Sequence, residues 1–479
     1  MGNYFIGIDI GTQGARVVLM DEQGEQVAAC EEAFELTTNS REEQSPLVWW
    51  KSCRSLMHML TAEAGHLVNL EDIRAITVTS TSGTIIPIGH DHEPLHNAIM
   101  YSNPCSVQEV AFCKEAALRN VKDGYRAFNA SSGLPKMRWL LNRFPEQVSK
   151  LHKFIHAADF IIGRLCGVYD VTDYTNALKS GYDLHHFEWP KYLSTEIGVD
   201  PKWLPDVRPS GAQLAPLLPQ LAKKWGLPMN VVVTTGITDG CASQIASGAV
   251  CQGQWNTTLG TTMVIKGVAT KEVVDPTGAI YNHRHPSGLW MPGGASNTGA
   301  DWVSCFFAGD DLNALAEAAK QHLLSEHLAW PLLQQGERFP FFAPNARGFW
   351  PEGDKEEMFA ACMEGVAFIE KYAYDRIESL SGEKVEQVLS TGGGSKNATW
   401  LKIRSNVLNR PVAKAKNVSG AAGAAILAAS NTCYASLEEA AKAMAKPEYV
   451  IEPIQQWVAP YEEKYRFFIE TLKAKNYLN

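Results

Sequence analysis

The apolar positions of the chain follow two periods, one typical of buried strands and the other typical of amphipathic helices. The start of the chain contains three apolar runs separated by short turns, which predicts three antiparallel strands at residues 4–10, 15–20 and 27–34. Apolar residues then recur at helical spacing from Ser45-Pro46 to about Ala64, which predicts a helix. Residues 73–80 are apolar or β-branched and predict a buried strand.

Later segments repeat this plan. A β-branched run at residues 231–235 predicts a strand that is buried on both faces. The same patterns predict a strand pair at 255–268, a long helix at 357–380, a strand at 385–390 and a helix from about Ala398. We also expect two helices within residues 136–167 and helical surface structure at 312–336. The repetition suggests a duplicated architecture.

Two glycine–threonine turns, one in each half, join predicted strands: Gly11-Thr12-Gln13-Gly14 and Gly260-Thr261-Thr262. Tight turns of this kind leave backbone N–H groups bare and form concavities that bind anions. Asp9 lies beside the first turn, and a carboxylate tolerates a nearby phosphate only if a cation lies between them. We therefore predict a phosphate-binding turn with Mg²⁺ held by Asp9. The alternative is an ordinary hairpin with a solvent-facing Asp, and the second copy favours phosphate binding.

Polar segments follow several predicted strands, at the end where open α/β sheets bind ligands. Hydroxyl side chains fill residues 79–84, and residues 170–183 are dense in donors and acceptors that suit a polyol. Asp239 follows the 231–235 strand, either as a helix cap or as a catalytic base. The glycine-rich segments 293–299 and 391–397 are candidate ligand loops, and the second has the strand–glycine–helix layout of a nucleotide site.

Composition narrows the function classes. The net charge of −9 without a long basic run argues against nucleic acid as a partner. No apolar run reaches the ~18 residues that a membrane span needs. The 10 cysteines contain no Cys-x-x-Cys pair, which favours reduced thiols and a cytoplasmic location over a disulfide framework or a zinc site. A small molecule is the expected partner, and a homodimer is left open.

In their order along the chain, these motifs resemble the FGGY family of carbohydrate kinases. The resemblance covers nearly the whole chain and rests on residues 7–12, 236–239, 257–262, 392–394 and 419–427. It implies an α/β fold of two actin-like (ribonuclease H-like) domains, each a mixed five-stranded sheet flanked by helices, with a nucleotide cleft between them. We expect the N-terminal domain on the sugar side at 1–248 and the C-terminal domain on the nucleotide side at 249–479.

The resemblance also implies a reaction, the phosphorylation of a terminal ketopentose hydroxyl by ATP with Mg²⁺. Asp239 is then the catalytic base, and Asp239 and Asp9 are the expected metal-binding residues. The residues expected at the nucleotide are Gly11, Thr12, Gln13, Gly260, Thr261, Asn297, Gly392, Gly393 and Asn397. Those expected at the sugar, besides Asp239, are Ser82, Thr84, Asn103 and Lys179.

Within the family, the chain most resembles the D-ribulose kinases of plants and cyanobacteria, through residues 81–84, 176–183, 281–284 and 294–299. One departure is Tyr101-Ser102-Asn103, where that group has Tyr-Asn-Asp, so an amide replaces a carboxylate. D-ribulose is the favoured substrate and D-xylulose the next. The alternatives are a kinase for another polyol or ketose, an actin-like ATPase, and a sugar-binding protein that has lost catalysis.

Overall fold

The computed structural model describes residues 2–122, 125 and 127–478, and the chain divides into two compact units. Unit 1 comprises Met1–Ala246, His283–Gly288 and Ser419–Ala445. Unit 2 comprises Ser247–Asn282, Leu289–Val418 and Lys446–Asn479. The first division thus falls two residues before the expected boundary at 248, and the segment 419–445 returns to unit 1.

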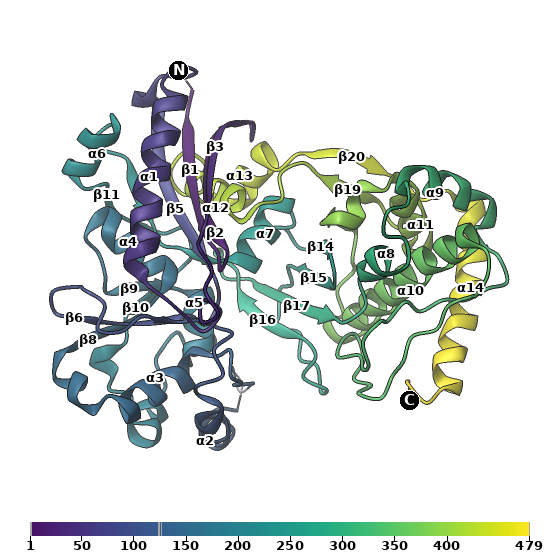
Figure 1. Ribbon diagram of the computed structural model, residues 1–479, viewed down its shortest axis with the longest axis horizontal. Coiled ribbons are helices and arrows are strands. Elements are labelled where there is room, and N and C mark those ends of the chain that lie inside the picture. The colour runs from purple at the N-terminus through teal and green to yellow at the C-terminus, as the bar shows by residue number, and fades with distance from the viewer. Residues whose placement is uncertain (1, 123–124, 126, 479) are drawn as a thin grey trace. The chain divides into compact units, whose positions relative to one another are not determined.

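Unit 1 is built on a seven-stranded sheet in the order β11-β12-β5-β1-β2-β3, with β13 also paired to β5. In Figure 1 its purple strands β1, β2, β3 and β5 lie side by side. The central β1 pairs antiparallel with β2 and parallel with β5. The strands are β1 (Tyr4–Ile10), β2 (Gly14–Asp21), β3 (Gln26–Ala33), β5 (Ile73–Ser80), β11 (Gln213–Pro216), β12 (Val232–Thr234) and β13 (Ile237–Thr238).

Side chains alternate across β1, so its two faces bury different partners. Ile6, Ile8 and Ile10 share a core with apolar residues of α1 (Pro46–Ala64) and α4 (Ala157–Cys166). Gly7 faces the other way, against α12 (Gly420–Ala429), where an added Cβ would lie 1.8 Å from the Ala421 carbonyl oxygen. All ten α12 residues are buried, which explains why this late segment belongs to unit 1.

Smaller elements complete unit 1. A four-stranded sheet has the order β4-β7-β6-β8 and a two-stranded sheet pairs β10 with β9. These strands are β4 (Glu43–Gln44), β6 (Ile85–Gly89), β7 (Ala98–Ile99), β8 (Leu151–His156), β9 (Val171–Asp173) and β10 (Asp206–Arg208). The remaining α-helices are α2 (Val107–Asn120), α3 (Gly133–Arg143), α5 (Tyr174–Ala177), α6 (Pro219–Trp225), α7 (Asp239–Ser247) and α13 (Leu437–Met444).

Unit 2 repeats the central pattern in a second seven-stranded sheet, β16-β17-β15-β14-β18-β19-β20. Here β14 pairs antiparallel with β15 and parallel with β18, as β1 does with β2 and β5. The strands are β14 (Gln254–Leu259), β15 (Met263–Gly267), β16 (Tyr281–Arg284), β17 (Trp290–Ser296), β18 (Gln387–Thr391), β19 (Val412–Ala415) and β20 (Pro447–Ile451). The expected duplication is therefore present, with two more strands per sheet than the five expected.

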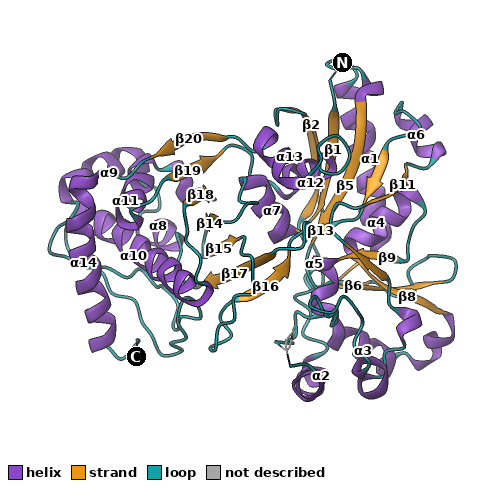
Figure 2. Cartoon of the chain, turned by 180° about the vertical axis from the view of Figure 1, so that it is seen from behind, coloured by secondary structure: helices purple, strands orange, loops and turns teal. Residues whose placement is uncertain are grey.

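Helices enclose the core of unit 2. The long α10 (Lys355–Ser381), α11 (Ala398–Leu408) and α14 (Gln455–Ala474) bury apolar residues together with β14 and β15. Figure 2 shows these helices beside the strands of this unit. The short α8 (Asp301–Phe306) and α9 (Leu312–Ala318) precede α10. Among the described residues, no helix combines the length and apolarity that crossing a membrane requires.

Two secondary-structure expectations were confirmed only in part, since the two expected helices α3 and α4 are present and α9 begins the segment 312–336. Residues 136–167 contain the strand β8 between α3 and α4, because residues 151–156 pair antiparallel with β6. A six-residue run is too short to separate the two periods, and α4 begins without an intervening turn. In the segment 312–336, α9 and a 3₁₀ turn end at His322, and Trp330 instead exchanges backbone hydrogen bonds with Phe349.

Candidate active site

The first glycine–threonine turn connects β1 and β2 as expected. Its ends are held by Gly11 N–H, which donates to the Gly14 carbonyl at 2.9 Å. The Thr12 carbonyl accepts from the Gln44 side chain at 2.8 Å, and the Gln13 carbonyl accepts from the Phe34 N–H at 2.9 Å. The Gly11 N–H and these carbonyl groups thus fix the turn, so the hydrogen of the Gly11 N–H is already used within it, while Gln13 is exposed. Such a turn is suited to presenting N–H groups to an anion.

Asp9 points to the α12 face of the sheet, as does Gly7. A Cβ on Gly420 would lie 2.6 Å from Asp9 Oδ2, so glycine is needed where α12 begins. Burial, followed by repulsion from Asp239, raises the pKa of Asp9 from 3.8 to about 7, against an opposing effect of Arg16. The positive charge of Arg16 offsets only part of the repulsion between the two carboxylates. Carboxylate oxygens placed in this way suit a hard divalent cation. Asp9 and Asp239, both predicted from the sequence, are therefore close enough to interact electrostatically.

Asp239 is the first residue of α7 and follows β13 directly. The strand β13 pairs with β5, with Ile237 opposite Thr79 and Thr238 opposite Ser80. The Asp239 side chain is exposed, and its Oδ1 accepts from the Gly240 N–H at 2.7 Å. An exposed carboxylate at the end of a buried strand is accessible to a substrate hydroxyl.

A second glycine of α12 positions the helix that carries Asp239. A Cβ on Gly423 would lie 1.9 Å from the Ala242 carbonyl oxygen in α7. The helix α12 thus contacts Asp9 through Gly420 and α7 through Gly423. The small residues of this helix permit the close packing, but the sequence did not show which elements the helix would contact.

The hydroxyl-rich segment after β5 presents groups without protein partners. The hydroxyl oxygens of Thr79, Ser80 and Ser82 are buried, and within the described part of the chain they have no hydrogen-bond partner. Thr84 is different, because its hydroxyl lies 2.8 Å from the Thr81 hydroxyl and accepts from the Tyr101 N–H at 3.3 Å. Of the two predicted residues, Ser82 therefore has the more available hydroxyl.

Lys179 lies beside this segment. Its Cδ would be 3.3 Å from a Cβ placed on Gly83, which has a φ of +88°. The neighbouring Lys136 is fully buried, and burial, with a contribution from Lys179, lowers its pKa to about 8. The structure thus brings the predicted residues Ser82 and Lys179 together in a region of positive charge.

Asn103 has little capacity left for a ligand. Its Oδ1 accepts from the Cys105 N–H at 2.8 Å, and its Nδ2 donates to the Glu42 carbonyl at 3.1 Å. The residue is 4% exposed. These bonds fix the loop around Asn103 and leave one Nδ2 hydrogen for other contacts.

In unit 2, the Gly260-Thr261-Thr262 turn connects β14 and β15 and packs on the following glycine loop. The Ala300 N–H donates to the Gly260 carbonyl at 2.7 Å, and a Cβ on Gly299 would lie 2.2 Å from the Thr261 carbonyl oxygen. Thr261 itself is exposed. This loop therefore sets the position of the turn.

Glu337, which no sequence pattern indicated, holds the same loop. Its buried carboxylate accepts from the Asn297 N–H at 2.7 Å, the Ser296 hydroxyl at 2.8 Å and the Thr298 hydroxyl at 2.8 Å. The predicted residue Asn297 also donates its side-chain amide to the Gly336 carbonyl at 2.8 Å. The backbone N–H and the side-chain amide of Asn297 thus both fix the shape of the loop.

A cavity of about 730 Å³ in unit 2 contains two of the predicted nucleotide residues, Gly393 and Asn397. Its size is within the range of small-molecule sites. Apolar and aromatic side chains form much of its lining, with Gly393 open on the cavity side because no heavy atom lies within 4 Å of an added Cβ. The full lining is Ala300, Val303, Ser304, Phe307, Ala308, Gly309, Asp310, Leu312, Asn313, Phe359, Gly393, Gly394, Lys396, Asn397 and Trp400.

Gly392 and Asn397 fix the backbone next to this cavity. Gly392 has a φ of +82°, and a Cβ there would lie 2.6 Å from the Leu259 carbonyl oxygen, so β18 and the end of β14 approach closely. Asn397 caps α11 by accepting from the Trp400 N–H at 3.0 Å. The aromatic residues Phe307 and Trp400 were not predicted as site residues, because aromatic side chains at helical spacing indicate a core equally well.

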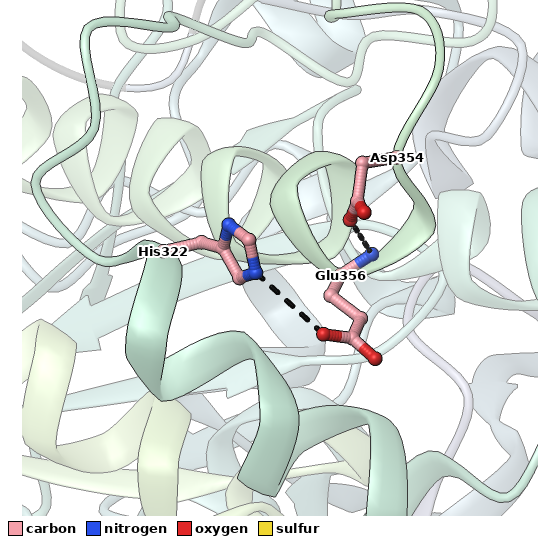
Figure 3. A group of neighbouring side chains, drawn as sticks. All are labelled: His322, Asp354 and Glu356. Atoms are coloured by element: carbon pink, nitrogen blue, oxygen red, sulfur yellow. Dashed lines mark hydrogen bonds and ion pairs between the residues drawn. The ribbon is translucent and has the colours of Figure 1, made fainter.

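A group of three possible metal ligands that the sequence did not indicate lies in unit 2. Figure 3 shows His322, Asp354 and Glu356, with His322 Nε2 and Glu356 Oε2 3.6 Å apart. Asp354 caps α10 through the Glu356 and Glu357 N–H groups at 2.8 and 2.9 Å. A cation here would face the positive end of a helix dipole. A helix cap and an ion pair explain these contacts.

Comparisons with known proteins agree with the family resemblance of the sequence motifs. Two family models, described as the N-terminal and C-terminal domains of the FGGY family of carbohydrate kinases, match residues 4–246 and 255–432. A xylulose kinase of Bacillus subtilis (strain 168) is 27% identical over 486 residues, which cover 96% of this chain and 94% of that protein. A gluconokinase of the same strain is 24% identical over 496 residues, with 98% and 95% covered.

A solved structure shows that the fold is shared. The ligand-bound xylulose kinase from Lactobacillus acidophilus matches with a TM-score of 0.82 at 24% identity, covering 98% of each chain. The two-domain α/β architecture expected from the sequence is therefore confirmed.

Proposed function

Because the chain belongs to the FGGY family of carbohydrate kinases, we propose that it transfers the γ-phosphoryl group of ATP to a terminal hydroxyl of a ketopentose. D-ribulose is the favoured acceptor and D-xylulose the next. The observation that carries the proposal is the placement of Asp9 near the end of β1 and of Asp239 directly after β13, where burial and, after it, repulsion from Asp239 raise the pKa of Asp9. The xylulose kinase relative supports a ketopentose, while the preference for D-ribulose rests on the sequence motifs alone.

Asp239 acts as the catalytic base in this proposal. It accepts the proton of the sugar hydroxyl and aligns that hydroxyl for attack on the γ-phosphorus. Its position supports the role, since it is exposed while the strand before it is buried. Phosphoryl transfer needs positioning and charge neutralisation more than covalent chemistry, so a fixed carboxylate is sufficient.

Asp9 and Asp239 are the residues that would hold Mg²⁺. The ion neutralises phosphate charge when it is bound. The raised pKa of Asp9 supports this assignment, because burial and, after it, repulsion from Asp239 disfavour the charged carboxylate and Arg16 opposes them only in part. A bound cation would favour the carboxylate form of Asp9.

The nucleotide contacts follow from the turns and the cavity. Gly11, Thr12 and Gln13 bind phosphate oxygens through one turn, and Gly260 and Thr261 do so through the other. Adenosine occupies the cavity beside Gly393 and Asn397, with Gly392 and Asn297 holding the surrounding backbone. The apolar lining of the cavity suits a purine ring, and the glycines let a flat group approach the backbone.

The sugar contacts are Ser82, Thr84, Asn103 and Lys179. Ser82 is the strongest of these, since its buried hydroxyl has no partner within the described residues. Thr84 and Asn103 already form hydrogen bonds within the protein and therefore have fewer donors and acceptors available for a sugar. A polyol would supply hydrogen-bond partners for the buried hydroxyls of Thr79, Ser80 and Ser82.

A second candidate acceptor is a sugar acid such as gluconate. Lys179 and the buried Lys136 place positive charge beside Ser82, which would favour a carboxylate on the substrate. The gluconokinase relative supports this alternative. We propose the ketopentose first because the xylulose kinase relative is the more similar of the two.

The proposal is tested by measuring ADP release with D-ribulose, D-xylulose, L-ribulose, xylitol, glycerol and gluconate. We expect D-ribulose to raise the rate well above the rate without sugar, and Asp239→Asn to abolish the increase. ADP release that no sugar stimulates would contradict the kinase assignment and favour an actin-like ATPase. Sugar binding without turnover would indicate that catalysis is lost, and stimulation by gluconate alone would favour the second candidate.

We also propose a cytoplasmic location and no nucleic-acid partner. The support is the sequence, whose 10 cysteines contain no Cys-x-x-Cys pair and therefore favour reduced thiols. A homodimer remains a proposal that sedimentation can test.

A further inference from the structure

The donor-rich segment around β9 and α5 is not an open polyol site, because its polar groups are buried and bonded to one another. Asp173 is fully buried, and its Oδ1 accepts from the Thr175 N–H at 2.8 Å and the Thr175 hydroxyl at 2.6 Å. The Ser210 hydroxyl donates to the same oxygen at 2.9 Å, and the Asn176 amide donates to Oδ2 at 2.5 Å. These groups therefore bond to one another, and of the described buried side-chain groups in α5 only Asn176 Oδ1 has no hydrogen-bond partner.

Thr175 connects this segment to the candidate base. Its hydroxyl oxygen accepts from the Thr238 N–H at 2.9 Å, and Thr238 immediately precedes Asp239. A hydroxyl has a single hydrogen to donate, and Asp173 takes it. The oxygen lone pairs of Thr175 are consequently turned toward Thr238. Asp173 thus fixes which way the hydroxyl points, and the hydroxyl fixes the backbone next to Asp239.

The other end of the segment carries a predicted sugar contact. Ser180, the neighbour of Lys179, has its hydroxyl 2.9 Å from His156 Nε2. His156 in turn lies 2.8 Å from Asp159 Oδ2 through Nδ1, and all three residues are buried. One short segment is therefore anchored at both ends, near Lys179 and near Asp239.

We propose that Asp173 and Thr175 are positioning residues for Asp239, which hold the base at the distance from the sugar that transfer requires. The proposal rests on the proposed function, in which Asp239 is the base. Neither residue contacts the reacting atoms in this account. Errors of about 1 Å in the position of a catalytic group reduce rates by up to ~100-fold, so a single hydrogen bond beside the base is enough to affect turnover.

The test uses the full-length protein and the isosteric variant Thr175→Val, which removes the acceptor for the Thr238 N–H. We expect kcat with D-ribulose to fall by ~10- to 100-fold per folded molecule, while KM for ATP stays within about twofold. Thr175→Ser restores the hydroxyl and should recover kcat to within about threefold of the wild type. Asp173→Ala removes the acceptor of the Thr175 hydroxyl, and for this second variant we expect the same separation of kcat from KM per folded molecule.

Ser210→Ala is the matched control. It removes a donor from the same Asp173 oxygen but leaves the bond between Thr175 and Thr238 in place. We expect Ser210→Ala to lose comparable thermal stability and to keep kcat within about threefold. A purely structural role for the segment would make Ser210→Ala and Thr175→Val equally damaging, and that result would overturn the inference.

Asp239→Asn in the same assay separates the two proposals. If Asp239→Asn is inactive and Thr175→Val turns over normally, the positioning role is wrong and the proposed base stands. If Asp239→Asn turns over normally, the proposed base is wrong, and the positioning role fails with it.

Discussion

Replacing Asp9 by Asn should stabilise the protein in the absence of divalent cations. The Asp9 carboxylate is largely buried, and burial, followed by repulsion from Asp239, raises its pKa from 3.8 to about 7. A raised pKa means that the folded state binds the proton more tightly than the unfolded state. The free energy of unfolding therefore falls as the pH rises from 3.8 through 7, and the loss is complete only above that range.

The size of the effect follows from the shift. At ~1.36 kcal/mol per unit, a shift from 3.8 to about 7 corresponds to about 4 kcal/mol above pH 7. At pH 5 the same shift lowers the free energy of unfolding by only about 1.5 kcal/mol, because Asp9 is still protonated in the folded state at that pH. Asn does not titrate, so the stability difference between Asp9→Asn and the wild type should widen by about 2 to 3 kcal/mol between pH 5 and pH 8.

The assay is urea unfolding in EDTA, followed by hydrogen exchange of the peptide that covers β1. This readout reports on unit 1 alone, which matters because the chain has two units. Glu32→Gln, an exposed carboxylate-to-amide change on β3, is the matched control and should show no widening. A difference that is the same at pH 5 and pH 8 would refute the account of Asp9 as a buried, repelled carboxylate.

Three further predictions concern turnover and specificity. Asp239→Asn should lower kcat by ~10²- to 10⁴-fold, the range expected for a general base, while calorimetry still detects ATP binding; near-full turnover would show that Asp239 is not the base. Asn103→Asp should sharpen the preference for D-ribulose over D-xylulose in kcat/KM, at a stability cost of about 1 to 3 kcal/mol, because a carboxylate cannot donate to the Glu42 carbonyl. An unchanged ratio would mean that Asn103 does not contact the sugar. Glu337→Gln should raise KM for ATP several-fold with little change in KM for the sugar, since Glu337 holds the loop on which the phosphate turn packs; equal changes in both constants would argue against this role.

Local features of the site could be predicted from the sequence. The β1–β2 and β14–β15 hairpins and the position of Asp239 after a buried strand depend on neighbouring residues, whose periodicity and turn chemistry are visible in the sequence. The recurrence of this hairpin in both units agreed with the expected duplication.

Contacts between distant segments could not be predicted. Gly420 against Asp9 and Lys179 against Gly83 arise from packing, and no local pattern indicates either pair. The donor-rich segment that holds Asp173 and Thr175 shows the limit most clearly. Its composition suits a polyol equally well, and only the burial of its groups shows that they bond to each other.

The most direct test of the central claim is a rapid-quench single turnover with ATP labelled in the γ-phosphate and an excess of D-ribulose. We predict that the label appears in a ketopentose phosphate, that NMR places it on the terminal hydroxyl, and that Asp239→Asn slows its appearance by ~10²-fold or more. Label that appears only as inorganic phosphate, at a rate independent of the sugar, would contradict the assignment of the chain as a ketopentose kinase.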